Sequence, residues 1–283
     1  MKRNFAALRI SGWAALAAVL IAGSSGRADE LSDVVPGHPG VTYGALLKQV
    51  MPGMQKNADG GWDSGPVKHL RELGGKPVQE LEISFQGVDA TTVREDGHKR
   101  LLLMTQENSG GSGFDAVLAA YDLDAKTPKL LDYLDAGRDR WNSISSTLVP
   151  LSATTDAFIA SSSHSNSNQS YELVTPLFLR GGKFHEITSL FVYGEGMCSY
   201  DRRQEASYAT RPDKGSEYNA FVVTFTIETK PGESDCGGGQ KPPKYSKTAV
   251  SDTWHWNAKK GAFVATTGVL DKLSEKNFTI ATQ

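Results

Sequence analysis

The chain has 283 residues, of which 39% are hydrophobic and 22% charged, proportions typical of a globular protein rather than a disordered one. Its 30 basic and 32 acidic residues give a formal net charge of −2, which excludes a nucleic-acid-binding protein that relies on overall positive charge. Two cysteines are too few for a disulfide-dense scaffold or a four-cysteine zinc site.

Residues 1–28 have the pattern of a cleaved secretory signal peptide. Basic residues precede an apolar segment from Ile10 to Gly23, and Gly26 and Ala28 provide the small residues of a cleavage site. The apolar segment is shorter than the roughly 20 residues that a transmembrane helix needs, so we expect no permanent membrane span. Cleavage would leave 26 basic and 32 acidic residues, a net charge of −6. We therefore expect a mildly acidic periplasmic or secreted protein that binds no nucleic acid.

Residues 29–75 form the predicted lead-in of helix and loop. Thr42 is a suitable N-cap for a helix over about 43–56, where apolar residues recur at helical spacing. Pro52 and Gly53 interrupt this pattern, so the helix should be short or broken there. A second, weaker helical pattern covers 66–73.

From residue 76 to the C-terminus the pattern changes to short runs rich in apolar and β-branched residues, separated by turn residues. Few helical segments lie between the runs, which disfavours a parallel sheet built from strand–helix–strand units. The sequence therefore predicts an all-β domain over 76–283, built from antiparallel hairpins, with a last helical turn or two at about 269–276. The expected strands lie at 78–85, 101–104, 116–121, 129–134, 157–160, 171–179, 184–193, 221–228, 253–256 and 262–266.

An internal repeat supports the hairpin interpretation. A shift of 57 places residues 101–134 on 158–191, with Leu101 on Phe158 and Tyr121 on Phe178. A looser third copy begins near Phe221. Units of this size suggest either a small propeller or a meander folded into a sandwich. If the repeat is real, its polar loops should lie on the same edge of the fold.

The polar loop of the second copy, residues 161–170, is the strongest candidate site. It is dense in hydroxyl and amide groups and contains one imidazole. The binding residues that we predict are His164, Asn166, Asn168 and Gln169, with Asn108 and Glu107 from the matching loop of the first copy. A carbohydrate or another component of the cell envelope is the ligand class to test first. Alternatively, residues 161–170 form a solvated hairpin turn that binds no ligand.

Two other functions stay open from sequence alone. In an exported hydrolase, His164 would act as a base beside a carboxylate such as Asp139 or Glu107 and a hydroxyl such as that of Ser162. The chain has no G-x-S-x-G or HExxH motif and no Gly-rich nucleotide-binding motif, so we assign no catalytic residue and expect no cofactor. A purely structural envelope protein is the remaining alternative.

Cys198 and Cys236 are 38 residues apart and both lie in loop-like sequence. In an exported protein we expect them to form a structural disulfide, which would stabilise the fold by about 4 kcal/mol. A reactive or metal-binding thiol pair is the alternative, although the CxxC spacing is absent.

Three further motifs can be interpreted either as ordinary structural features or as functional sites. Residues 57–63 resemble the middle of a calcium-binding loop of integrin-type repeats, but Gln55 stands where the first carboxylate should be, so we expect a surface turn and assign no metal. The carboxylates of Asp122, Asp124 and Asp135 could form a hydrolytic pair or simply sit in turns. Trp254 and Trp256 should share one strand face, as core or as an exposed sugar platform.

Overall fold

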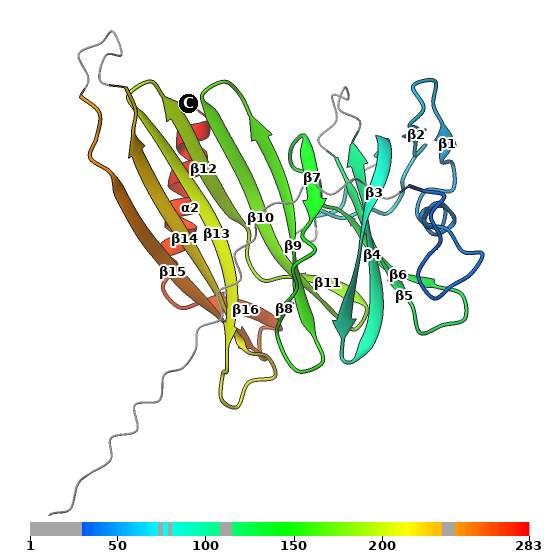
Figure 1. The fold of residues 1–283 in the computed structure, drawn as a ribbon. Helices are drawn as coiled ribbons and strands as arrows, with labels where there is room; N and C mark the ends of the chain where they lie inside the picture. The colour runs from blue at the N-terminus through cyan, green and yellow to red at the C-terminus, as the bar shows by residue number, and fades with distance from the viewer. Residues whose placement is uncertain (1–29, 73–75, 79–80, 108–114, 234–240, 283) are drawn as a thin grey trace, which may run out of the picture.

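The computed structural model describes residues 30–72, 76–78, 81–107, 115–233 and 241–282. Over these residues the chain forms two antiparallel sheets and two helices, which confirms the all-β prediction (Figure 1). The N-terminal signal pattern, Asn108 and Cys236 lie outside the described residues. Neither helix of the described residues is long and apolar enough to cross a membrane.

The small sheet has six strands in chain order, each antiparallel to the next. Successive residues of a strand point to opposite faces, so the apolar run of β4 is buried on both sides of this sheet. The strands are β1 (Gln55–Lys56), β2 (Trp62–Asp63), β3 (Ser84–Glu95), β4 (His98–Glu107), β5 (Val117–Asp122) and β6 (Lys129–Asp135).

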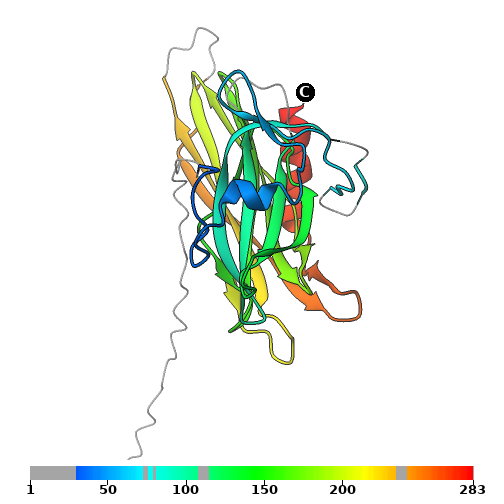
Figure 2. The same ribbon diagram turned by 90° about the vertical axis from the view of Figure 1, so that its right-hand side faces the viewer.

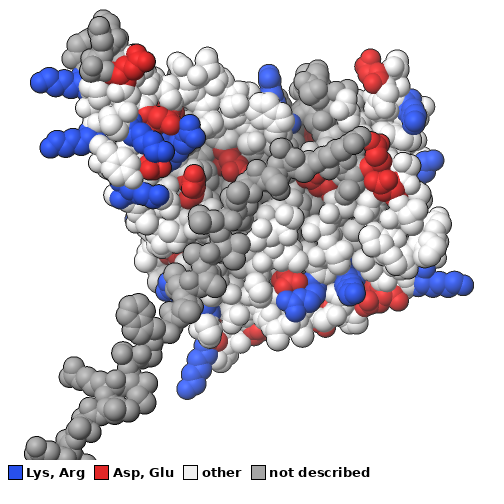
Figure 3. Space-filling view, in the orientation of Figure 1, with Lys and Arg blue, Asp and Glu red and all other residues white. Residues whose placement is uncertain are grey.

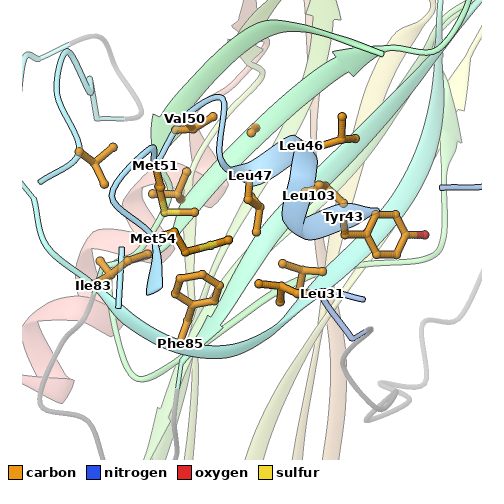
Figure 4. Packing of buried hydrophobic residues seen from close by; sticks show 14 of the residues in the cluster. Leu31, Tyr43, Leu46, Leu47, Val50, Met51, Met54, Ile83, Phe85 and Leu103 are labelled. Carbon is orange, nitrogen blue, oxygen red and sulfur yellow. The ribbon is translucent and has the colours of Figure 1, made fainter. Parts of the chain in front are cut away.

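One face of the small sheet is covered by the N-terminal lead-in (Figures 2 and 4). The short helix α1 (Tyr43–Leu47) contributes Leu46 and Leu47, which are fully buried together with Leu101 and Leu103 of β4. The hydroxyl of buried Tyr121 donates to the carbonyl of Leu46 at 3.0 Å, which satisfies the phenol inside this core. The lead-in is thus packed onto the sheet by its apolar side chains.

The other face of the small sheet packs against the large sheet. Leu102 and Met104 of β4 meet Phe158 of β9 and Leu177 of β10 in one buried cluster. The large sheet runs in the order β16 (Ala262–Ala265), β15 (Ser246–Asn257), β14 (Ala220–Pro231), β13 (Tyr200–Arg211), β12 (Leu190–Met197), β10 (Gln169–Arg180), β9 (Asp156–Ser165) and β7 (Trp141–Ile144), with β11 (Lys183–Glu186) beside β10 and β8 (Val149–Pro150) beside β9.

The large sheet curls, so that its two ends share a core. Phe178 of β10 contacts Trp256 of β15 and Phe263 of β16, with ring centroids 6.0 and 5.6 Å apart. The two halves separate at β12 and β13, which pair over only three residues of each strand. A curl of this kind leaves an opening wherever two neighbouring strands diverge.

The C-terminal helix α2 (Val269–Ala281) packs where β12 and β13 diverge (Figure 1). Ser274 accepts the backbone N–H of Phe191 at 2.7 Å, and Asn277 donates to the carbonyl of Phe191 at 2.8 Å. Gln204 of β13 bonds the same Asn277 from the other side at 2.7 and 3.0 Å. Two polar side chains of the helix therefore replace strand pairing for the backbone of β12.

Most of the predicted elements are confirmed, and the exceptions have physical causes. Thr42 caps α1 by accepting the N–H of Ala45 at 3.2 Å, but the helix ends at Leu47. The helical pattern over 66–73 is wrong, because Val67 and Arg71 form isolated bridges with Leu81 and Pro77. The pattern did not predict β13, whose exposed polar residues hide its period of two, nor the short strands β1, β2, β7 and β8. The strand expected at 78–85 begins only at Ser84, and the strand expected at 184–193 is divided into β11 and β12.

The strands follow the meander alternative rather than the propeller. Strands β4 and β5 correspond to β9 and β10 under the shift of 57, but the first copy lies in the small sheet and the other two lie in the large one. A propeller needs each copy to form its own blade. The two sheets instead pack face to face as in a sandwich.

Candidate functional site

An open pocket of about 360 Å³ lies over strands β7, β9, β10, β12 and β13, where the large sheet begins to separate. Its side chains fall into an aromatic group, a group of small polar residues and a charged group. They include Trp141, His164, Tyr171 and Tyr193; Ser163, Ser165, Ser170 and Gly194; and Glu172, Arg203 and Glu205.

The pocket is hollow because small residues meet on one face of three neighbouring strands. Ser170 of β10 pairs with Ser165 of β9 and with Gly194 of β12, so these three residues share a face. A Cβ atom at Gly194 would come within 2.8 Å of the Ser170 hydroxyl oxygen, so glycine allows this close packing. Glu172 pairs with Ser163 and lies on the same face.

Trp141 stands at the rim of the pocket, on the first residue of edge strand β7. The residue is 51% exposed, which is unusual for an indole. Its ring centroid lies 6.1 Å from that of His164, whose ring stacks on Tyr171 at 5.4 Å. Trp141 therefore offers a large apolar surface beside polar groups.

A hydrogen-bonded group of three side chains lies next to the pocket, with His164 and Tyr171 paired on the opposite sheet face from Ser163 and Glu172. His164 Nδ1 lies 3.0 Å from Asp139 Oδ1, and the Tyr171 hydroxyl donates to Asp139 Oδ2. Burial and the contact with Asp139 raise the pKa of Tyr171 to about 12, so its phenol stays protonated. The backbone N–H of Arg140 also donates to Asp139 Oδ1 at 2.7 Å. His164 and Tyr171 are thus fixed by one carboxylate.

The same geometry tests the arrangement that a hydrolase would need. The predicted carboxylate, Asp139, is in contact with His164. The predicted hydroxyl is turned elsewhere, because Ser162 donates to Asn142 Oδ1 at 2.5 Å. Among the described residues, no serine hydroxyl is hydrogen bonded to His164. The histidine therefore has an orienting carboxylate and lacks a nucleophile.

Two carboxylates of the pocket have no cationic partner in the described part of the chain. Burial raises the pKa of Glu172, and a hydrogen bond from Ser161 offsets part of this effect. Glu205 is exposed at the other side of the pocket. The nearby guanidinium is engaged, since Arg203 Nε contacts Asp201 at 2.9 Å. The pocket is therefore locally acidic.

Of the six predicted binding residues, His164 lines the pocket. Asn166 closes the β9–β10 turn, where its side-chain oxygen accepts the N–H groups of Asn168 and Gln169 at 3.1 and 2.9 Å. Glu107 ends β4 opposite Phe85, and Asn108 lies outside the described residues. Ligand contacts by these loop residues stay a prediction.

Sequence reasoning missed Trp141 and Glu172 as site residues. The segment 161–165 reads Ser-Ser-Ser-His-Ser, so no alternation of residue types marks the two faces of its strand. We interpreted this segment as a loop because of its serine content. Which strands lie beside it cannot be obtained from the pattern of one segment.

The other motifs have structural roles. Trp254 and Trp256 are 3% and 7% exposed in the core of the large sheet, which confirms their interpretation as core. Residues 57–63 form the β1–β2 hairpin, where Asp63 accepts bonds from Asn57 and Ser84 at 3.2 and 2.7 Å. Across the described residues, no group of three or more His, Cys, Asp or Glu side chains is arranged to hold a metal ion.

Asp122 and Asp124 are also engaged. Arg100 contacts Asp122 at 2.5 Å, and His98 contacts Asp124 at 2.5 Å. Asp135 is buried and accepts the backbone N–H of Gly137 at 3.0 Å. These pairings account for the three carboxylates as turn and strand-end residues.

Comparison with protein families, curated proteins and solved structures finds no match to this chain.

Proposed function

We propose that the chain is an exported binding protein that holds a carbohydrate, or a similar polyhydroxylated component of the cell envelope, in the Trp141 pocket. One observation carries the proposal: an exposed indole, several serine hydroxyls and a carboxylate line a single pocket. The apolar face of a sugar ring can stack on an indole, while its hydroxyls exchange hydrogen bonds with serine and carboxylate groups.

The rigid support of the rim favours binding over chemistry. His164 and Tyr171 are held by Asp139, so the surface beside Trp141 is ordered before a ligand arrives. A hydrolase would need a hydroxyl on His164, and Ser162 is bonded to Asn142 instead. Binding requires no such group.

Export is the second part of the proposal, and the cysteines offer a way to test it. The chain following β14 lies beside Cys198, whose carbonyl accepts the N–H of Glu233 at 3.0 Å. This contact supports the proposal of a disulfide, because Glu233 precedes Cys236 by three residues in the sequence. Mass spectrometry of peptides from the unreduced protein, purified from the periplasm or medium, should show a Cys198–Cys236 cross-link. Two free thiols in the exported protein would contradict the disulfide.

The binding proposal is tested by thermal unfolding of the mature protein with a panel of oligosaccharides and soluble envelope polymers. A ligand that binds the folded state should raise the melting temperature. We expect Trp141→Ala to abolish this rise and Tyr245→Ala, which removes another exposed aromatic ring outside the pocket, to preserve it. Stabilisation by no member of the panel would favour the purely structural alternative and overturn the proposal.

A further inference from the structure

We propose that the pocket selects a ligand that carries a primary amine beside its hydroxyl groups, such as an amino sugar without its acetyl group. This inference rests on the proposed function, because it names the chemical class of the ligand in the same pocket. The selectivity would come from the carboxylates and the aromatic ring that line the pocket, because a neutral sugar does not need two carboxylates without a cationic partner.

The charged side chains of the pocket favour a cationic ligand. Glu172 and Glu205 both line the pocket, and the described residues give neither of them an ion-pair partner. The two cationic candidates at the pocket are engaged, Arg203 by Asp201 at 2.9 Å and His164 by Asp139 at 3.0 Å. An incoming ammonium group would therefore meet a locally acidic site whose carboxylates have no cationic partner among the described residues.

Glu172 is unfavourably placed in the absence of a ligand. Its carboxylate is partly buried, it pairs across the sheet with Ser163 and Val192, and it accepts a hydrogen bond from Ser161. A partly buried charge is unfavourable until it is paired. Burial raises its pKa, which agrees with an unpaired carboxylate. A bound ammonium group would favour the ionised form and return part of the lost solvation.

The rim of the pocket also suits a cation. Trp141 pairs with Ser163 and so lies on the same sheet face as Glu172, and the exposed face of an indole attracts cations. The serine hydroxyls would serve the neutral hydroxyl groups of the ligand. Acetylation of the amine would remove its charge and enlarge it, so the same pocket should discriminate against the acetylated sugar.

Charges elsewhere on the surface also attract a cationic oligomer, so the test must separate them from the charges inside the pocket. On the visible part of the face drawn in Figure 3, acidic and basic side chains are interspersed. At physiological salt, exposed charges farther than roughly 8 Å are largely screened. The preference should therefore depend on the carboxylates inside the pocket.

The test is calorimetric titration of the mature protein at pH 7 with three oligomers of equal length. They are β-1,4-linked glucosamine, its fully N-acetylated form and β-1,4-linked glucose. We expect the glucosamine oligomer to bind about tenfold or more tightly than either neutral oligomer, since one charge-assisted hydrogen bond is worth about that factor. The advantage should shrink as salt is raised.

Glu172→Gln separates charge from shape, because glutamine keeps the size and the hydrogen-bonding oxygen. This variant should lose the preference for the amine and still bind the neutral oligomers. Glu275→Gln, on the exposed surface of α2, is the matched control and should retain the preference. Equal affinity of the wild type for all three oligomers would overturn this inference and leave the proposed function standing. No binding of any oligomer would count against both.

Discussion

Two regions of the large sheet combine tryptophan with a carboxylate and use the combination in opposite ways. In β15, Asp252 and Trp254 are both 3% exposed. At the rim of the pocket, Trp141 is 51% exposed and Glu172 is partly buried. The same residue types therefore occur once in the core and once around an open space.

The hydrogen bonds of the two carboxylates explain the difference. Asp252 accepts the backbone N–H groups of Thr253 at 2.8 Å, Thr267 at 3.2 Å and Val269 at 3.0 Å. Burial alone would raise the pKa of Asp252, but these bonds outweigh it and lower the pKa. Since Gly268 at the N-cap provides no side chain, Asp252 also satisfies the start of α2. It has a complete structural role.

Glu172 lacks such a set of donors, and burial raises its pKa. A carboxylate satisfied by backbone donors indicates structure, whereas a carboxylate left without a charged partner beside an exposed indole indicates a site for something else. The difference between these two regions predicts three effects of substitutions on the free energy of unfolding, which differ in size and in sign.

The largest expected effect is in the core. Trp254→Ala should lower the free energy of unfolding by about 3–5 kcal/mol, because it leaves a large cavity among buried aromatic rings. Trp141→Ala should change it by less than about 0.5 kcal/mol, because half of that residue is already exposed. Urea unfolding at pH 7 measures both. Equal losses would show that Trp141 is a core residue and would break the comparison.

The second effect concerns Asp252. Its pKa is lowered in the folded state, so its contribution to stability is present above the unfolded value of 3.8 and is lost as the pH falls through the folded value. Asp252→Asn should therefore lower the free energy of unfolding at pH 7 by about 1–3 kcal/mol, and by less in acid. Asp59→Asn, in the exposed turn between β1 and β2, serves as the control. An Asp252→Asn variant as stable as the wild type at pH 7 would contradict the structural role.

The third effect has the opposite sign. Because the folded pKa of Glu172 is raised, its contribution is fully present below the unfolded value of 4.5 and is lost as the pH rises through the folded value. Glu172→Gln should therefore make the unliganded protein slightly more stable at pH 7, by less than about 1 kcal/mol. The gain should vanish below pH 4.5 in the same unfolding series. A loss of stability at pH 7 would mean that Glu172 already has a structural partner.

The amino-acid pattern predicted what depends on one segment at a time. The burial of Trp254 and Trp256, the cap at Thr42 and the antiparallel strands all follow from local alternation or spacing. The pattern could not predict that β12 and β13 diverge, because the cause lies in α2, whose Ser274 and Asn277 occupy the gap.

The candidate site was predicted in part for the same reason. His164 was identified from the polarity of its own segment. Trp141, Glu172 and Arg203 belong to three other strands, and their meeting depends on register and on the curl of the sheet. Neither property is written in any single stretch of the sequence.

The most direct test is to follow the indole N–H signals of the tryptophans by NMR while a ligand is titrated into the mature protein. Trp141→Phe and Trp254→Phe assign the signals of interest. The account predicts that an oligosaccharide, and most strongly the glucosamine oligomer, shifts the Trp141 signal and leaves those of Trp254 and Trp256 in place. A ligand that binds while the Trp141 signal stays unchanged would contradict the assignment of this pocket as the binding site.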